Sequence, residues 1–157
     1  MRLFFASWPP PAMAKALAQW AHEAQRVCGG RIAHEDAIHL TLAFLGEADP
    51  QAALVAGRAV RVRATSLPID VARYWKHNRI VWVGPGKVPP ELAELARGLG
   101  ETREFAGHVT LLRKAHPPTQ LPPLPPLEWP VREFLLVNST LGPEGPSYEV
   151  LERFALS

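Results

Sequence analysis

The chain has 157 residues, 47% of them hydrophobic and 20% charged, which is the size and composition of one globular domain with its own core. The formal net charge of +2 permits a polyanionic partner but excludes the block basicity of a strong nucleic-acid binder. No apolar run reaches the roughly 18 residues that span a bilayer, and the single cysteine excludes an internal disulfide. We therefore expect one cytoplasmic, monomeric domain over residues 1–157 without membrane contact.

The first part of the chain predicts a strand followed by a helix. Residues 2–7 have the pattern of a buried strand, and prolines 9–11 fit the first turn of a helix. Apolar residues spaced by three or four predict one buried helical stripe: Met13, Leu17, Trp20, Ala24 and Val27. Gly29 and Gly30 end this helix, which favours Cys28 as a small apolar residue over a reactive nucleophile.

The next part of the chain predicts strands around a second helix. A strand at residues 38–45 precedes a helix at about residues 50–63, which Asp49 is expected to cap. Two further strands are expected at residues 67–75 and 79–83, joined by the turn "KHN".

From residue 79 the order of strand, helix and strand returns. Prolines 89–90 open a helix, a strand begins at His108, and two last strands cover residues 131–141 and 148–156. Because both halves follow the same order, the sequence predicts a structural duplication.

A proline-rich segment at residues 117–126 separates the second half from the last strands. Its PxxP spacings are compatible with binding to an SH3-type groove, in which case the chain is an interaction protein. Such a run more often forms an extended connection across the surface, and we favour that interpretation.

The same pair of polar residues occurs in the middle strand of each half. "HLTL" contains His39 and Thr41, and "HVTL" contains His108 and Thr110. With six histidines in the chain, chance predicts only about 0.2 His-x-Thr triplets. Strand alternation turns these polar residues to one face and the apolar residues of both motifs to the other: Leu40, Leu42, Val109 and Leu111. Packing does not require the polar residues, so the repeat indicates chemistry.

Two histidines and two threonines suit a displacement at phosphorus. A histidine titrates at about pH 6.5, so one can accept a proton as a base while the other donates one as an acid. Threonine hydroxyls can hold the non-bridging phosphate oxygens. This chemistry needs no metal, and the consecutive His34, Glu35 and Asp36 lack the spacing of a metal site.

The segments "HLTLAFLGE" and "HVTLLRKA" resemble the paired HxTx motifs of the two-histidine phosphoesterase superfamily. Within it, the chain is most similar to the RNA 2′,3′-cyclic phosphodiesterases, also called 2′-5′ RNA ligases. The similarity extends to "RLFFA", "RIVWVG", "WPVREFLLVNSTL" and "YEVLERFAL". The chain departs from the family at "EFAGHVTLL", where Ala-Gly replaces a bulkier residue and a proline, and it is short, which implies trimmed loops.

The resemblance implies an α+β fold with two pseudo-symmetric lobes of sheet and helix around a central cleft. It also implies hydrolysis of RNA 2′,3′-cyclic phosphate ends to 2′-phosphates, with 2′-5′ ligation as a reverse-type activity. It implies no cofactor, and it makes His39 the proton donor and His108 the proton acceptor. Thr41 and Thr110 would bind the phosphate. Arg113 matches an arginine that follows the second motif of the family. A phosphate contact and a surface charge both stay open for Arg113, because strict alternation turns it away from His108.

Three alternatives accompany this hypothesis. The chain is compatible with a non-catalytic module that binds RNA ends or nucleotides, and with a phosphodiesterase for another small cyclic phosphate. The third alternative is the proline-rich interaction protein. Trp75 and Trp82 are candidates to stack on a base, although tryptophan in a strand more often belongs to the core.

Overall fold

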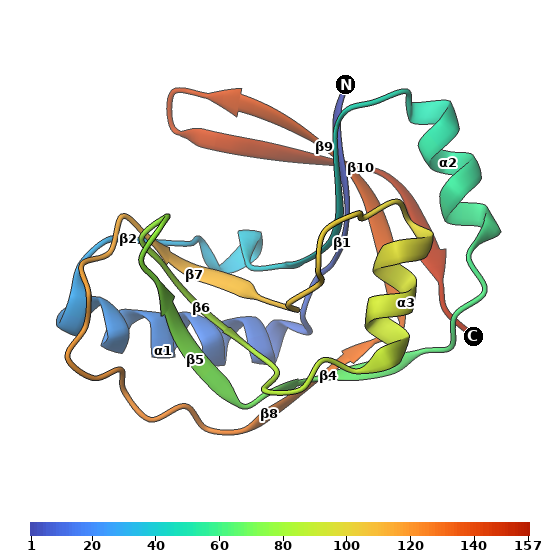
Figure 1. The fold of residues 1–157 in the computed structure, drawn as a ribbon. Coiled ribbons are helices and arrows are strands. Elements are labelled where there is room, and N and C mark those ends of the chain that lie inside the picture. The colour runs from blue at the N-terminus through green and yellow to red at the C-terminus, as the bar shows by residue number, and fades with distance from the viewer.

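The computed structural model describes residues 1–157 and contains two four-stranded sheets and a smaller two-stranded sheet (Figure 1). The elements are, in chain order, β1 (Arg2–Ser7), α1 (Pro11–Cys28), β2 (Arg31–Ile32), the 3₁₀ helix η1 (Glu35–Ala37), β3 (Leu40–Glu47), α2 (Pro50–Ala59), β4 (Thr65–Ile69), β5 (Val71–Trp75), β6 (Ile80–Gly84), α3 (Pro90–Gly98), β7 (Val109–Arg113), β8 (Leu127–Val131), β9 (Glu133–Gly142) and β10 (Gly145–Ala155). The sheet orders are β10-β9-β1-β3, β2-β7-β6-β5 and β4-β8. None of the helices is both long and apolar enough to cross a membrane.

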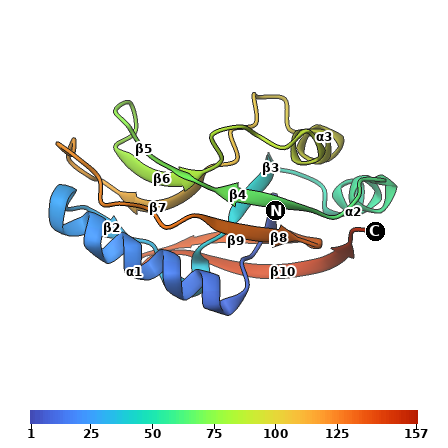
Figure 2. The same cartoon turned by 90° about the horizontal axis from the view of Figure 1, so that it is seen from below.

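Helices α1 and α3 each follow a strand of one large sheet and pack against the other sheet, which joins the two lobes. Helix α1 follows β1 of the first sheet but packs against β2 and β7 of the second sheet. Helix α3 follows β6 of the second sheet but packs against β3 of the first sheet. Figure 2 shows α1 at one end of the molecule and α2 and α3 at the other. The predicted repeat of strand, helix and strand is therefore present, and one continuous core extends under both sheets.

The structure corrects three predicted elements. Residues 67–75 form two strands of different sheets, because the chain turns at Asp70, whose carboxylate accepts a hydrogen bond from the Gly86 amide at 2.7 Å. Helix α2 ends at Ala59 and not near residue 63, although Asp49 caps it as predicted by accepting from an amide of the first turn. Val27 is 46% exposed and lies outside the buried stripe of α1.

The proline-rich connection lies between β7 and β8. Residues 117–126 form no regular secondary structure and are mostly exposed, so the predicted extended connection is confirmed. The indole of Trp20 in α1 donates to the carbonyls of Pro122 and Pro123 at 3.3 and 3.2 Å. Strand β8, which sequence analysis missed, follows it and contains Pro130; a two-stranded sheet tolerates this proline because both of its strands are edges.

Candidate active site

The histidine and threonine of each motif share one face of a strand. His39 directly precedes β3 and His108 directly precedes β7, and both are partly exposed, as are Thr41 and Thr110. The alternate apolar residues of both motifs are fully buried: Leu40, Leu42, Val109 and Leu111. The predicted alternation is therefore confirmed. The surface formed by the four polar residues is named the histidine face below.

The two motifs lie near one another although they belong to different sheets. Burial is the main reason that the pKa of His39 lies below its ordinary value, and the charge of Arg113 adds to this effect. Burial likewise lowers the pKa of His108 to about 4, and the charges of Arg113, Arg103 and His39 add to it. Electrostatic effects between these groups require them to be close. The fold thus combines both histidines and Arg113 in one electrostatic environment.

A β-bulge returns Arg113 to the histidine face. Thr110 pairs with Trp82 of β6, but the next pair joins Val81 to Leu112, so the alternation shifts by one residue. Two consecutive residues of β7 are consequently buried, and Arg113 after them is exposed. The argument from strict alternation, which turned Arg113 to the opposite face, is wrong because the bulge is not visible in the sequence pattern.

The same irregularity occurs in β3 and places Phe44 in the position that corresponds to Arg113. Thr41 pairs with Ala6 of β1, whereas the next pair joins Phe5 to Ala43. Phe44 is 43% exposed, which is unusual for so large an apolar side chain. Each lobe therefore presents a third residue five positions after its histidine, an aromatic ring in one and a guanidinium in the other.

The backbone before β3 fixes the ring of His39. Its Nδ1 lies 2.7 Å from the carbonyl oxygen of Ala37, which can only accept, so Nδ1 carries a proton and Nε2 is free for proton transfer. The carbonyl of the preceding residue, Asp36, accepts a hydrogen bond from Nε1 of Trp8 at 2.9 Å. Two successive carbonyls of η1 therefore hold the histidine and its neighbouring tryptophan.

Three aromatic rings surround His39. Trp8 stacks on it with ring centres 4.8 Å apart and an interplanar angle of 21°. Phe4 lies 5.3 Å away, and Tyr148 of β10 presents its ring at 5.5 Å and 78°. These contacts bury the imidazole and hold it in one orientation.

His108 lies against a different pair of rings. Trp75 of β5 is 4.7 Å from it and Trp82 of β6 is 6.1 Å from it. Trp82 is buried, as predicted for a core residue, and its indole nitrogen has no hydrogen-bond partner. Trp75 is only partly buried and packs on His108, so it belongs to the site as well as to the sheet. No protein carbonyl binds the His108 ring.

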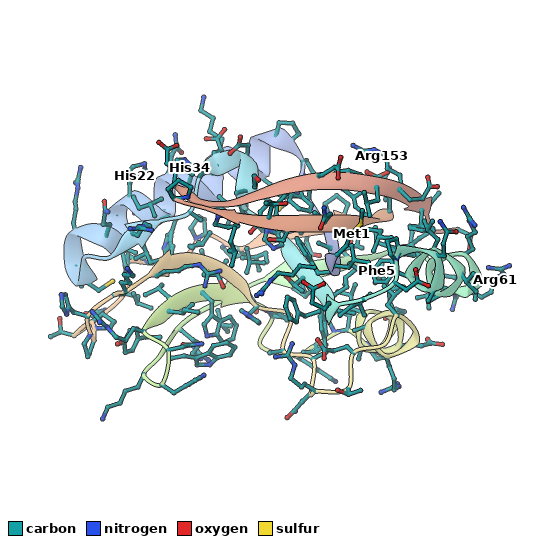
Figure 3. All side chains as sticks on the ribbon, turned by 90° about the horizontal axis from the view of Figure 1, so that it is seen from above. Met1, Phe5, His22, His34, Arg61 and Arg153 are labelled. Carbon is teal, nitrogen blue, oxygen red and sulfur yellow. The ribbon has the colours of Figure 1, made fainter.

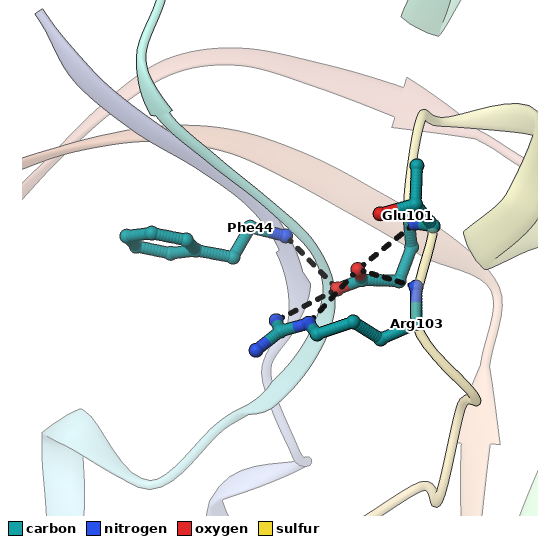
Figure 4. A network of polar contacts seen from close by, with 4 residues as sticks. Phe44, Glu101 and Arg103 are labelled. Carbon is teal, nitrogen blue, oxygen red and sulfur yellow. Dashed lines mark hydrogen bonds and ion pairs between the residues drawn. The ribbon is translucent and has the colours of Figure 1, made fainter.

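The loop between α3 and β7 places a further arginine near His108. Glu101 accepts hydrogen bonds from Nε and Nη2 of Arg103 at 3.2 and 3.0 Å and from the Phe44 amide at 3.4 Å (Figure 4). Burial by itself raises the pKa of Glu101, but these hydrogen bonds lower it below its ordinary value. The ionised carboxylate therefore connects this loop to β3 and keeps Arg103 beside the histidine face.

The remaining candidates lie outside this face. His22 in α1 and His34 before η1 have exposed side chains at the surface (Figure 3). No group of three or more His, Cys, Asp or Glu side chains is placed to hold a metal ion. Hollows of about 490 and 540 Å³ occur beside β5 and beside Trp8, and neither is lined by His39 or His108.

Sequence reasoning missed three residues near the histidines, Trp8, Arg103 and Tyr148, and the exposed Phe44 of β3. One signal was available for Phe44, since it follows His39 at the spacing with which Arg113 follows His108. Trp8 follows β1 and Tyr148 lies in β10, so both are distant from His39 in the sequence, and no local pattern predicts their contacts with it.

Two lobes that each present a His-x-Thr strand define a two-histidine phosphoesterase. A family model described as LigT like Phosphoesterase matches residues 8–82, which include the first motif. The RNA 2′,3′-cyclic phosphodiesterase of Escherichia coli (strain K12) is 34% identical, with 99% of this chain and 97% of the relative covered. The enzyme of the same name from Thermus thermophilus is 32% identical, with 99% and 90% covered.

Solved structures agree with these sequence matches. Apo E. coli LigT matches with a TM-score of 0.86 at 34% identity, and E. coli LigT complexed with ATP matches with a TM-score of 0.87 at 32% identity. Each match covers 99% of this chain and 97% of the other. The chain therefore belongs to the LigT-like phosphoesterase family and has its fold.

Proposed function

We propose that this protein is a hydrolase that converts RNA 2′,3′-cyclic phosphate ends to 2′-phosphomonoesters without a metal. The observation that carries the proposal is the placement of His39 and His108 beside Arg113, within electrostatic range of one another. Relatives that cover the full chain are named RNA 2′,3′-cyclic phosphodiesterase, which supports the same substrate class.

In the proposed reaction His108 is the base. Burial and the nearby arginines lower its pKa to about 4, so it is neutral at pH 7 and accepts a proton from water. The water oxygen bonds to phosphorus as the bond from phosphorus to the 3′ oxygen breaks. The 3′ oxygen takes a proton from His39, and the products are a 2′-phosphate and a 3′-hydroxyl. The hydroxyls of Thr41 and Thr110 donate to the non-bridging oxygens, and Arg113 balances their charge.

The different surroundings of the histidines support this assignment of roles. The carbonyl of Ala37 accepts from Nδ1 of His39, which raises its pKa against the larger effect of burial. His108 has no such carbonyl, and two arginines oppose its protonation. This difference in partners supports His39 as the proton donor. The negative charge of a bound phosphate raises the pKa of both histidines and further populates the acid form of His39.

Ligation is the same step with another nucleophile. When the 5′-hydroxyl of a second RNA end replaces water, His108 removes its proton and a 2′-5′ phosphodiester forms. The same residues catalyse cleavage of this linkage in the reverse direction, so reversible 2′-5′ RNA ligation belongs to the proposal.

Turnover in EDTA tests the proposal. The protein is incubated with adenosine 2′,3′-cyclic phosphate, and the products are separated and identified. We expect only adenosine 2′-phosphate. A 3′-phosphate product or a requirement for added metal would contradict the mechanism, whereas binding of the nucleotide without turnover would support the non-catalytic module.

We further infer that the protein acts as a cytoplasmic monomer. One chain supplies both histidines, both threonines and Arg113, and its single cysteine is buried and forms no disulfide. Light scattering during size-exclusion chromatography should give the mass of one chain, and a dimer mass would contradict the inference.

A further inference from the structure

A second arginine shares the outer face of the sheet with Arg113. In the antiparallel register of β2 and β7, Arg31 lies directly opposite Arg113 and Ile32 lies directly opposite Leu112. Leu112 is fully buried and Ile32 packs against the same core. Residues that are direct partners across two strands point to the same side. Arg31 and Arg113 therefore both point away from the core, toward the side that carries His108.

These two arginines have no partners within the protein. Neither guanidinium makes a hydrogen bond or an ion pair, although Arg79 at the same end of the sheet donates to the carbonyls of Lys114 and Ala115. Like charges directly opposite each other on paired strands are destabilising. The fold thus keeps an uncompensated pair of positive charges beside the histidines, and an anion bound between them would remove the repulsion.

The order of the strands gives the direction in which this positive charge extends. Strand β2 lies next to β7 and forms the edge of the sheet, so Arg31 lies one strand spacing, about 5 Å, beyond Arg113. Arg113 acts electrostatically on both histidines, whereas Arg31 lies farther from them. A ligand that reaches both arginines must extend from the reacting group toward the sheet edge.

We propose that Arg31, together with Arg113, binds a second phosphate group of the substrate beside the reacting cyclic phosphate. Planar guanidinium groups bind phosphate oxygens in a bidentate manner, so two of them suit a phosphate monoester or diester. The inference rests on the proposed function, because it takes the cyclic phosphate to lie between the histidines. The second phosphate is either the 5′-phosphate of a mononucleotide or the internucleotide phosphate of an RNA end.

Three substrates separate these possibilities. Adenosine 2′,3′-cyclic phosphate has no second phosphate, its 5′-phosphorylated form has a monoester, and the dinucleotide ApA with a 2′,3′-cyclic phosphate end has a diester. We expect kcat/KM of the wild-type protein to be on the order of tenfold higher for at least one of the last two. A gain for the dinucleotide alone identifies the internucleotide phosphate. A gain for the 5′-phosphorylated nucleotide alone identifies a terminal phosphate, and a gain for both identifies a site for either.

Substitution of Arg31 tests whether this gain comes from the proposed site. Arg31→Gln should remove the gain and leave kcat/KM for adenosine 2′,3′-cyclic phosphate unchanged. Arg63→Gln removes the same charge from an exposed position near α2 and should leave all three values unchanged. Equal kcat/KM for the three substrates with the wild-type protein, or a gain that survives Arg31→Gln, would overturn the inference while the proposed function stands.

Binding and stability measurements test the inference without depending on turnover. Tryptophan fluorescence should report tighter binding of adenosine 2′,5′-bisphosphate, of the dinucleotide ApA with a 2′-phosphate end, or of both, than of adenosine 2′-phosphate. Arg31→Gln should weaken only the tighter binding. An equal effect on all three ligands, or no effect, overturns the inference even in a protein without turnover. Because the substitution removes a repulsion, Tm should stay the same or rise. A lower Tm in Arg31→Gln together with an equal loss of kcat/KM for all three substrates would assign a structural role to Arg31 and overturn the inference.

Discussion

The lobe of His39 and the lobe of His108 share a backbone but differ in what surrounds the histidine. Both have a His-x-Thr strand, a bulge after the threonine and a third exposed residue five positions after the histidine. His39, however, donates to the carbonyl of Ala37 and is enclosed by three aromatic rings. His108 has two tryptophans, no carbonyl partner and two arginines within electrostatic range.

This difference shows how one duplicated backbone can serve acid and base chemistry. The repeated strand fixes where each imidazole lies, because the alternation and the bulge are properties of the backbone pairing. The neighbours outside the strand set how readily each imidazole takes a proton. The pair consequently has matched positions and different neighbours, and a displacement with one donor and one acceptor requires such a difference between the two groups.

The largest effects should follow from removing either histidine. His39→Ala and His108→Ala should each lower kcat by on the order of 10² to 10⁴, and the double variant should be little slower than the slower single variant. The losses do not add because both groups serve one transition state. Steady-state kinetics measure the three values, and circular dichroism checks that all variants stay folded. Multiplied losses in the double variant would show that the two histidines act independently.

Removing a threonine should have a smaller effect than removing a histidine. Thr41→Ala and Thr110→Ala should each lower kcat by on the order of 10 to 10³, since each removes one hydrogen bond to the phosphate and leaves proton transfer intact. Thr41→Ser and Thr110→Ser keep the hydroxyl and serve as matched controls. If the serine variants are as slow as the alanine variants, the hydroxyls are not the groups that matter.

The sequence predicted the parts of this comparison that follow from periodicity. Alternation identified the polar face of both strands, and the repeated order of elements identified the two lobes. The bulge was not predictable, because it depends on how β7 pairs with β6. Strict alternation therefore placed Arg113 on the wrong face of the strand. The contacts of Trp8 and Tyr148 with His39 depend on sheet order, which local patterns do not encode.

Trp8, which stacks on His39, allows a test of how the surroundings of this histidine affect its protonation. A cation over the face of an indole is stabilised by about 0.5–1 kcal/mol, so Trp8 should favour the protonated form of His39. Trp8→Leu keeps an apolar neighbour but removes this effect. The descending alkaline limb of kcat/KM against pH should therefore shift by about half a unit toward lower pH.

Trp75→Leu is the corresponding change in the other lobe. It removes a ring beside the base His108 and should leave the alkaline limb of the pH profile where it is. A uniform loss of rate at every pH in Trp8→Leu, with no shift of the limb, would assign Trp8 to packing alone.

The last prediction concerns stability in acid. The folded-state pKa of His108 is about 4, below the ordinary 6.5, so the unfolded chain binds this proton more tightly. The stability that depends on neutral His108 is fully present above pH 6.5 and is lost as the pH falls through 6.5 toward 4. His108→Gln, which does not titrate, should therefore lose about 2 kcal/mol less unfolding free energy between pH 7.5 and pH 5 than the wild-type protein. His39→Gln should also lose less unfolding free energy than the wild-type protein, because burial lowers the pKa of His39 as well. Urea unfolding at the two pH values measures both differences, and a loss in His108→Gln equal to that of the wild-type protein would show that the folded protein does not hold His108 neutral.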